Sequence, residues 1–491
     1  MSAERESHPG GILMSAHQVS SQGSVGREYV RVGERRPTPA TIDWASAPST
    51  FKRYRGCATL PAAPLCGLLR DVYGLTRQQW NAPASEGKST ALRPVPAGGA
   101  RFPCELYLVA GRDQPIPPGV YHYDAAHHWL DVLREGDFGE GLSLLVTVAF
   151  WKNVFKYGEF SYRLHSCDTG VVIGQSLAVL EHHGLRPTVR YQFSDAEYDR
   201  LLGLDPDYES VYAVIALSLD ASIAGQPAPL GPPAAIPQPQ VDQTQTIGLY
   251  PLPAKLHEMS MQQGASPWPL ADDLPPVLAG APASARSLPL PAVPLSLLDG
   301  LHHRRSSRGY FSPESLTRRQ LAALLAASMP GYANDLDAGE KPATIRRTAL
   351  FCAVNRVDGI EPGAYSYDPA RHTLEQLRTS DIGAELHAAV TSLMFNLRHV
   401  SLCLFPVADY GTGLSAYGDR WYRVQNMEAG IVVQRLYLAS AALGLGCRTQ
   451  MGFHPDTVNR LLGLGDSPLT SLIHVLIGPD RNPGNSYEYA W

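Results

Sequence analysis

An internal repeat constrains this chain more than any other feature of its sequence. Pro118–Asp124 (PGVYHYD) returns as Pro362–Asp368 (PGAYSYD), and Tyr157–Arg163 returns as Tyr417–Arg423. In both copies a second glycine follows twelve residues after the glycine of the Tyr-Gly pair, and an apolar helical pattern and a Leu-Leu-Gly-Leu motif come next. The same landmarks in the same order at nearly the same spacing indicate one domain that is written twice.

Each copy carries strand and helix signals in succession, which is typical of an α+β domain. We therefore expect two tandem domains, each a mostly antiparallel sheet flanked by helices. Two copies on one chain are expected to pack as an intramolecular pseudo-dimer, with the function at their interface. The expected divisions are a flexible tail over 1–40, a first domain over 41–220, a connector over 221–295 and a second domain over 296–491.

The expected connector is defined by its proline content. Sixteen of the 41 prolines lie between residues 221 and 294, where they exclude a helix or a central strand and favour an extended segment. Within this segment Ile247–Met261 is more apolar and is expected to dock as a short helix. Residues 1–40 show no sustained apolar period, which predicts a mobile tail.

Charge and residue spacing exclude several classes of function. A net charge of −5 argues against general nucleic-acid binding, which needs a basic surface. No stretch approaches the roughly 18 apolar residues of a membrane span, and the N-terminus lacks a secretory signal, so we expect a cytoplasmic protein without membrane contact. The seven cysteines and sixteen histidines show no metal-ligand spacing, so neither a metal site nor a disulfide framework is expected.

Two segments have the chemistry to bind a flat ligand that carries a phosphate. One places guanidinium groups beside a hydroxyl, which suits bidentate hydrogen bonding to phosphate. Its members are Arg304, Arg305, Ser306 and Arg308. The other is a loop whose glycines would let the backbone approach a planar ring closely. Its members are Pro96, Ala97, Gly98 and Gly99. Taken alone, each segment is equally compatible with an ordinary surface turn.

Two further segments are candidates because of their place in the repeat. Lys156 and Tyr157 open the Tyr-Gly landmark of the first copy, and a lysine beside a tyrosine can act as a general base when burial lowers its pKa. Gln450, Met451 and Gly452 follow the apolar helix of the second copy, where their backbone could lie against a planar ligand. The alternatives are an exposed lysine and a helix-exit turn.

Together, these motifs and their order resemble the FMN-dependent nitroreductase superfamily, and within it the azoline dehydrogenases that act on ribosomally made peptides. The resemblance covers about residues 41–220 and 296–480. The opening segments Thr41–Trp44 and Ser49–Tyr54 are similar to the tandem thiazole- and oxazole-forming dehydrogenases of thiopeptide pathways.

The resemblance implies FMN sites that are each assembled from two copies of the domain. The second copy keeps the arginine–serine motif and Met451–Gly452, where the first copy has Phe51–Arg55 and Tyr191–Phe193. The first copy keeps the glycine loop and the lysine, where the second has Pro342–Arg347 and Ala416. Because the retained parts are complementary, we expect one complete site and one FMN per chain.

The resemblance also implies an activity. FMN would take two electrons from a thiazoline or oxazoline in a precursor peptide, giving a thiazole or oxazole, and oxygen would reoxidise the flavin. Lys156 and Tyr157 match the family's Lys–Tyr pair, and either could be the base. A cyclodehydratase complex is the expected partner. The alternatives are an NAD(P)H-dependent nitro or quinone reductase and a non-catalytic scaffold that recruits the precursor peptide.

Overall fold

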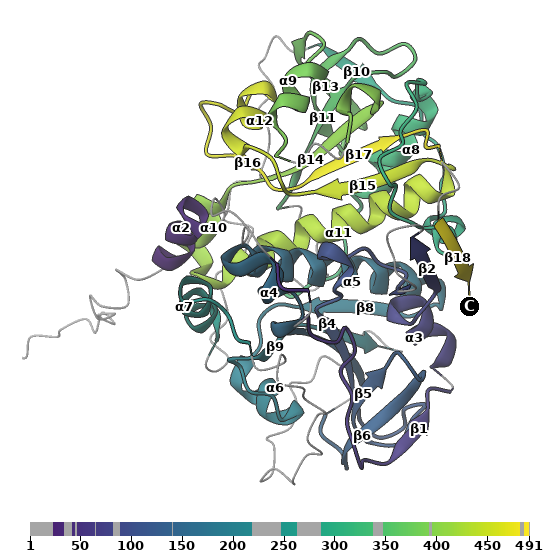
Figure 1. The fold of residues 1–491 in the computed structure, drawn as a ribbon, viewed down its shortest axis with the longest axis vertical. Coiled ribbons are helices and arrows are strands. Elements are labelled where there is room, and N and C mark those ends of the chain that lie inside the picture. The colour runs from purple at the N-terminus through teal and green to yellow at the C-terminus, as the bar shows by residue number, and fades with distance from the viewer. Residues whose placement is uncertain are drawn as a thin grey trace, which may run out of the picture.

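Two long helices, α5 (Ser161–His182) and α11 (Arg420–Ala442), run side by side through the centre of the molecule. One sheet lies on each side of this helix pair (Figure 1). The computed structural model describes residues 23–33, 42–44, 47–63, 65–81, 89–139, 141–218, 247–262, 286–336, 347–391, 395–481 and 486–490. In this part of the chain, no helix is long and apolar enough to cross a membrane.

The two sheets have the same strand order, β1-β6-β5-β4-β7-β9-β8 in the first half and β10-β13-β12-β11-β14-β17-β15 in the second. The strands of the first sheet are β1 (Thr59–Pro61), β4 (Cys104–Ala110), β5 (Gly119–Asp124), β6 (Trp129–Glu135), β7 (Leu142–Ala149), β8 (Arg186–Arg190) and β9 (Glu209–Ser218). Those of the second are β10 (Ser287–Pro289), β11 (Ala349–Val354), β12 (Gly363–Asp368), β13 (Thr373–Thr379), β14 (Leu402–Ala408), β15 (Gly446–Gln450) and β17 (His474–Gly478), with β16 (Thr470–Ser471) paired to β14. The predicted fold, a duplicated α+β unit with antiparallel sheets packed as a pseudo-dimer, is confirmed.

The repeated Pro-Gly-x-Tyr-x-Tyr-Asp motif forms β5 in one half and β12 in the other. Both strands carry a bulge at the first tyrosine, and in both that tyrosine donates a hydrogen bond to the preceding turn. The Tyr121 hydroxyl reaches the Pro117 carbonyl at 2.6 Å, and the Tyr365 hydroxyl reaches the Glu361 carbonyl at 2.7 Å. The motif is repeated because it builds the same turn and strand twice.

The repeated glycines of the central helices lie where α5 and α11 cross. A Cβ on Gly170 would lie 1.9 Å from the Met427 carbonyl oxygen, and one on Gly430 would lie 2.3 Å from the Cys167 carbonyl oxygen. Only glycine permits two helix backbones to approach this closely. Both helices are buried on nearly every side, and side chains from both halves form one core around them.

Shorter helices cover the remaining surfaces. Apolar side chains of α6 cover the outer face of the first sheet, and those of α9 and α12 cover the outer face of the second. A capping box between Thr317 and Gln320 begins α8. The helices are α2 (Ser24–Arg31), α3 (Cys66–Tyr73), α4 (Trp151–Tyr157), α6 (Asp195–Leu202), α7 (Pro251–Ser260), α8 (Arg318–Ser328), α9 (Gly383–Ala389), α10 (Tyr410–Tyr417) and α12 (Pro455–Leu461).

Two segments expected outside the domains are part of the fold. The tail predicted over 1–40 is wrong for α2, because Tyr29 is fully buried against Tyr162 and Tyr422 of the two central helices. The connector predicted over 221–295 includes α7, as expected of its apolar stretch, but also β10, which pairs with β13. The second sheet therefore begins before residue 296. Residues 1–22 and 34–40 of the predicted tail, and 221–246 and 263–285 of the predicted connector, lie outside the described residues.

The end of the chain crosses to the other half. Strand β18 (Ser486–Ala490) pairs with β2 (Arg77–Asn81), which in turn pairs with β3 (Ser89–Leu92). This small third sheet places the start of β2 beside the loop that begins at Arg93.

Candidate functional site

The arginine–serine motif of the second half meets the glycine loop of the first half. Arg304 follows a short 3₁₀ turn, Leu297–Gly300, and its guanidinium is buried. Its Nη2 donates a hydrogen bond of 3.0 Å to the carbonyl of Arg93, which lies just before Pro94 and Val95 on the way to the glycine loop. The two motifs, although 211 residues apart in sequence, therefore form one site.

Arg304 has unused hydrogen-bonding capacity at this junction. Its buried Nε and Nη1 have no hydrogen-bond partner among the described residues. Burial and the positive charge of Arg77, the first residue of β2, both lower the pKa of Arg304. Two buried guanidinium groups of like charge are stable together when an anion lies against them, so this end of the site is suited to a phosphate.

The rest of the motif is aligned along β15. The backbone of Ser306 forms an isolated parallel β-bridge with that of Cys447 on β15. The Ser306 hydroxyl donates a hydrogen bond of 3.2 Å to the Tyr437 hydroxyl. That tyrosine, on α11, also accepts from the Thr449 backbone at 3.1 Å. Arg305 is exposed and Arg308 is half-buried, so among the three motif arginines Arg304 is the one placed inside.

Gln450, Met451 and Gly452 lie at the end of β15, all half-buried. The Gln450 Nε2 lies 3.3 Å from His474 Nδ1, while its buried Oε1 has no hydrogen-bond partner among the described residues. A Cβ on Gly452 would lie 2.6 Å from Thr391 Oγ1, so the backbone here is closely packed.

Lys156 and Tyr157 lie directly against the glycine loop. They end α4, and the positive φ of 53° at Gly158 stops that helix. A Cβ on Gly99, itself at a φ of 62°, would lie 2.5 Å from both Lys156 Nζ and Tyr157 Oη. The structure thus brings together the lysine, the tyrosine and the loop.

The surroundings of this cluster shift the pKa values of the two candidate bases in opposite directions. Burial and the charge of Arg101 lower the pKa of Lys156, which favours the neutral amine. Burial and the nearby Asp168 carboxyl raise the pKa of Tyr157, which keeps its phenol protonated. Arg448 of β15 acts on the same tyrosine in the opposite direction, so its charge reaches this cluster from the other half of the molecule.

Asp168 holds the glycine loop in place. It lies on α5, and its carboxylate oxygens accept from the Gly98 backbone at 3.1 and 3.2 Å. Burial raises the pKa of Asp168 to about 7. Sequence reasoning missed this residue, although it lies ten residues after Gly158, at the place where the second copy has Glu428.

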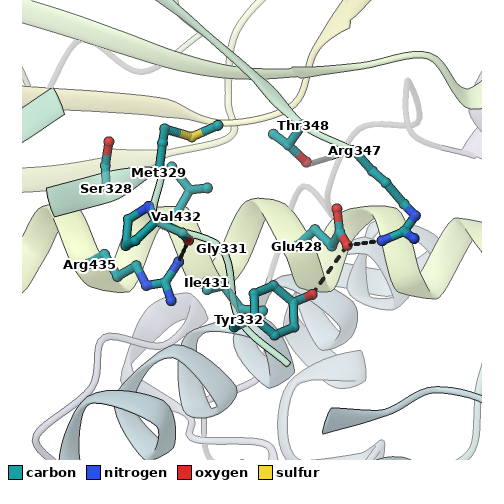
Figure 2. Close-up of a pocket in the computed structure, with 11 residues that line it drawn as sticks. Ser328, Met329, Gly331, Tyr332, Arg347, Thr348, Glu428, Ile431, Val432 and Arg435 are labelled. Atoms are coloured by element: carbon teal, nitrogen blue, oxygen red, sulfur yellow. Dashed lines mark hydrogen bonds and ion pairs between the residues drawn. The ribbon is translucent and has the colours of Figure 1, made fainter. Parts of the chain in front are cut away.

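The pseudo-dimer has a second position, around Glu428, that corresponds to the site around Asp168. Side chains occupy this second position. Glu428 of α11 accepts from Arg347 Nη1 and from the Tyr332 hydroxyl, each at 3.2 Å (Figure 2). The Tyr332 hydroxyl lies 2.8 Å from that of Tyr191, which stands where the second copy has Met451. Asp335 accepts from the backbone of Tyr191 at 2.8 Å, which anchors that segment.

The space left at this second position is small. The cavity that Arg347, Tyr332 and Glu428 line is about 30 Å³, enough for one or two water molecules. Of the counterpart of the glycine loop, 342–347, only Arg347 is described, and residues 342–346 lie outside the described residues.

One sequence equivalence needs correction. Phe51–Arg55 is not the counterpart of the arginine–serine motif, because it precedes β1, whereas the motif follows β10, the counterpart of β1. The segment that follows β1 and α3 leads to Arg77, so Arg77 lies where the second half has the arginine–serine motif. The sequence comparison overlooked this residue. Aligning the copies on their edge strands would have found it.

The residues present fit a phosphate-bearing planar cofactor such as FMN. The unpartnered Arg304 donors suit the phosphate, and the Gly98–Gly99 backbone allows close approach of a ring. The unpartnered Gln450 Oε1 offers an acceptor to a polar ring edge. The Arg304 hydrogen bond to Arg93 joins the first two of these features across the two halves, and Gln450 lies on β15, the strand that carries Arg448.

Comparisons with known proteins agree with this architecture. The sequence model described as the nitroreductase family matches residues 301–478. A protein of Methanocaldococcus jannaschii named as a nitroreductase is 33% identical over 177 residues, which cover 36% of this chain and 88% of that protein. The trifolitoxin-processing protein TfxB of Rhizobium leguminosarum is 28% identical over 145 residues, 26% of this chain and 39% of that protein. A crystal structure named as a nitroreductase, from Anabaena variabilis, superposes with a TM-score of 0.77 at 27% identity and covers 94% of this chain and 100% of its own.

Proposed function

Because the chain belongs to the nitroreductase family, whose members generally bind FMN, we propose that it is an FMN-dependent azoline dehydrogenase with one FMN per chain. Its substrate would be a thiazoline or oxazoline ring in a ribosomally made precursor peptide, and its product the aromatic azole. The proposal rests on one observation above all: Lys156, Tyr157 and the glycine loop are in contact at a junction that carries phosphate-binding chemistry.

Different residues of the chain would bind the cofactor, position the glycine loop and transfer the proton. Arg304, with the charge of Arg77 beside it, would hold the phosphate, and Asp168 keeps the Gly98–Gly99 backbone in position. The bound flavin supplies the hydride acceptor, and oxygen is the proposed final electron acceptor. Lys156, whose pKa is lowered, takes the proton that leaves the azoline ring through its neutral Nζ. Tyr157, whose pKa is raised, remains a phenol that donates a hydrogen bond.

The relative TfxB supports a precursor as substrate. TfxB is named as a trifolitoxin-processing protein, and we infer by analogy that this chain acts on the precursor of a natural product. We extend this to a peptide substrate delivered by a cyclodehydratase complex, since azolines must be formed before they can be oxidised.

The test is an incubation of the flavin-loaded protein with a peptide that contains one thiazoline, under air. The expected result is a mass loss of two hydrogen atoms per ring, with Lys156→Ala as an inactive control that still binds flavin. Rapid bleaching of the flavin by NADPH, without any change in the peptide, would instead support a nitro or quinone reductase. A protein that cannot be loaded with FMN would support the scaffold.

A further inference from the structure

An exposed tryptophan stands over the proposed catalytic lysine. Lys156 Nζ lies 5.1 Å from the centroid of the Trp44 ring and 4.9 Å from that of Tyr157. Trp44 also packs edge-on against Phe155, with ring centroids 5.9 Å apart. Yet 55% of Trp44 remains exposed, although a tryptophan usually buries most of its surface. One ring edge is therefore held against α4 while much of the indole surface stays open to solvent.

The segment that carries Trp44 is tied down on both sides of the site. The Pro48 carbonyl accepts from Arg101, the residue whose charge acts on Lys156. The centroid of the Phe51 ring lies 5.9 Å from the guanidinium carbon of Arg93, which precedes the glycine loop. Lys52 is buried against the first sheet, where it forms a 2.7 Å ion pair with Glu209. The Ala47 amide donates to the Trp44 carbonyl at 3.3 Å, which links Trp44 to these anchored residues.

Packing alone does not account for this position. Phe155 is half-buried and contacts Trp44 at one place, and the Lys156 amine lies over one region of the indole ring. The counterpart of Lys156 in the second copy is Ala416, so the second half has no amine at this place. An exposed aromatic face beside the reactive amine is what a substrate ring would contact first.

We propose that Trp44 is the stacking platform for the five-membered ring of the substrate, and that it distinguishes a cyclised residue in the peptide from an uncyclised cysteine or serine. This inference rests on the proposed function. Stacking on an indole favours a flat or nearly flat ring, which a thiazole and a thiazoline provide and an open side chain does not. Trp44 would act in binding, while Lys156 acts in proton transfer.

The test compares Trp44→Ala and Trp44→Phe with the wild type in steady-state oxidation of a peptide that carries one thiazoline. We expect Trp44→Ala to raise KM by roughly two- to tenfold while kcat and its pH profile stay unchanged, and Trp44→Phe to recover most of the KM. Tyr250→Ala is the matched control, because Tyr250 is also an exposed aromatic residue, 42% exposed, on the segment that begins α7. Unchanged flavin content shows that each variant is folded.

A binding measurement separates this inference from the proposed function. The wild type should bind a thiazole-containing peptide more tightly than its uncyclised cysteine counterpart, and Trp44→Ala should lose that difference. Equal binding of both peptides by the wild type would overturn the inference. So would an unchanged KM in Trp44→Ala, or a lowered kcat with a shifted pH profile, which would assign Trp44 to tuning the lysine. Failure of the wild type to oxidise the thiazoline while the binding difference persists would overturn the activity and leave the platform in place.

Discussion

At the scale of single residues, the two candidate bases differ in environment although they are neighbours in sequence. Lys156 and Tyr157 both contact the position where Gly99 lacks a Cβ. Burial disfavours the charged form of each group, and the charged forms are opposite: an ammonium for lysine and a phenolate for tyrosine. The same burial therefore favours a neutral amine and a neutral phenol, which is the pairing of a proton acceptor with a hydrogen-bond donor.

A pH dependence follows for the proposed oxidation. Because the Lys156 amine must be neutral to accept a proton, kcat should rise with pH until the amine is fully deprotonated. The limb should lie below the usual lysine pKa of about 10.4, since that pKa is lowered. We expect Tyr157→Phe to keep this limb and Lys156→Ala to lose about 10²–10⁴-fold in kcat. A rising limb that persists in Lys156→Ala and vanishes in Tyr157→Phe would exchange the two roles.

Arg304 predicts selectivity for the phosphate of the cofactor. Arg304→Ala should weaken FMN binding at least about 30-fold, because a buried charge-assisted contact contributes about 2–5 kcal/mol, while riboflavin binding should change little. Arg304→Lys should restore part of the preference. Titration of the apoprotein with FMN and riboflavin measures both constants. Arg319→Ala, at an exposed position on α8, is the control, and an unchanged FMN-to-riboflavin ratio in Arg304→Ala would contradict the assignment.

At the scale of secondary-structure elements, the crossing of α5 and α11 explains the repeated glycines. In an ordinary helix a glycine is replaced by alanine with a gain of about 1 kcal/mol in helix propensity. At Gly170 and Gly430 the added methyl group would meet backbone oxygen atoms of the other helix. Helix α5 carries Asp168 of the first half, and α11 belongs to the second half. The geometry of their crossing therefore also sets how far Asp168 lies from α11.

Gly170→Ala should therefore lower the free energy of unfolding by about 3 kcal/mol or more, since overpacking at backbone cannot be relieved by a rotamer change. The matched control is Gly67→Ala on α3, where a Cβ would meet nothing within 4 Å. That variant should be neutral or slightly stabilising. Denaturant unfolding followed by circular dichroism measures both, and equal stability of the two variants would show that the helices can separate without cost.

At the scale of the whole molecule, duplication has produced two positions that are no longer equivalent. At one, Asp168 accepts from a backbone amide and leaves room beside Gly99. At the other, the corresponding Glu428 is neutralised by Arg347 and hydrogen-bonded by Tyr332 (Figure 2). The Tyr332 hydroxyl in turn lies 2.8 Å from that of Tyr191. Protein side chains therefore occupy this position through the Arg347–Glu428 ion pair and the Tyr332 hydrogen bond.

The chain should consequently bind one equivalent of FMN. Flavin released by heating and measured by absorbance is expected to give about one molecule per polypeptide at saturation. Two equivalents would show that the Arg347–Glu428 pair opens to admit a second cofactor. The variant Lys156→Ala should still bind one, because the lysine acts on the substrate and not on the phosphate.

The sequence by itself determined the duplication, the α+β class and most of the segments that meet at the site, because repeats, proline content and glycine loops are local signals. It misjudged α2 and β10, whose structure depends on burial against Tyr162 and Tyr422 and on pairing with β13. It also overlooked Arg77, Asp168 and the exposed face of Trp44. Only the tertiary structure decided these, and only it showed the Arg347–Glu428 pair in the second position. The physical reason is that contacts such as Arg304–Arg93, 211 residues apart, depend on how two helices cross and not on any neighbouring residue.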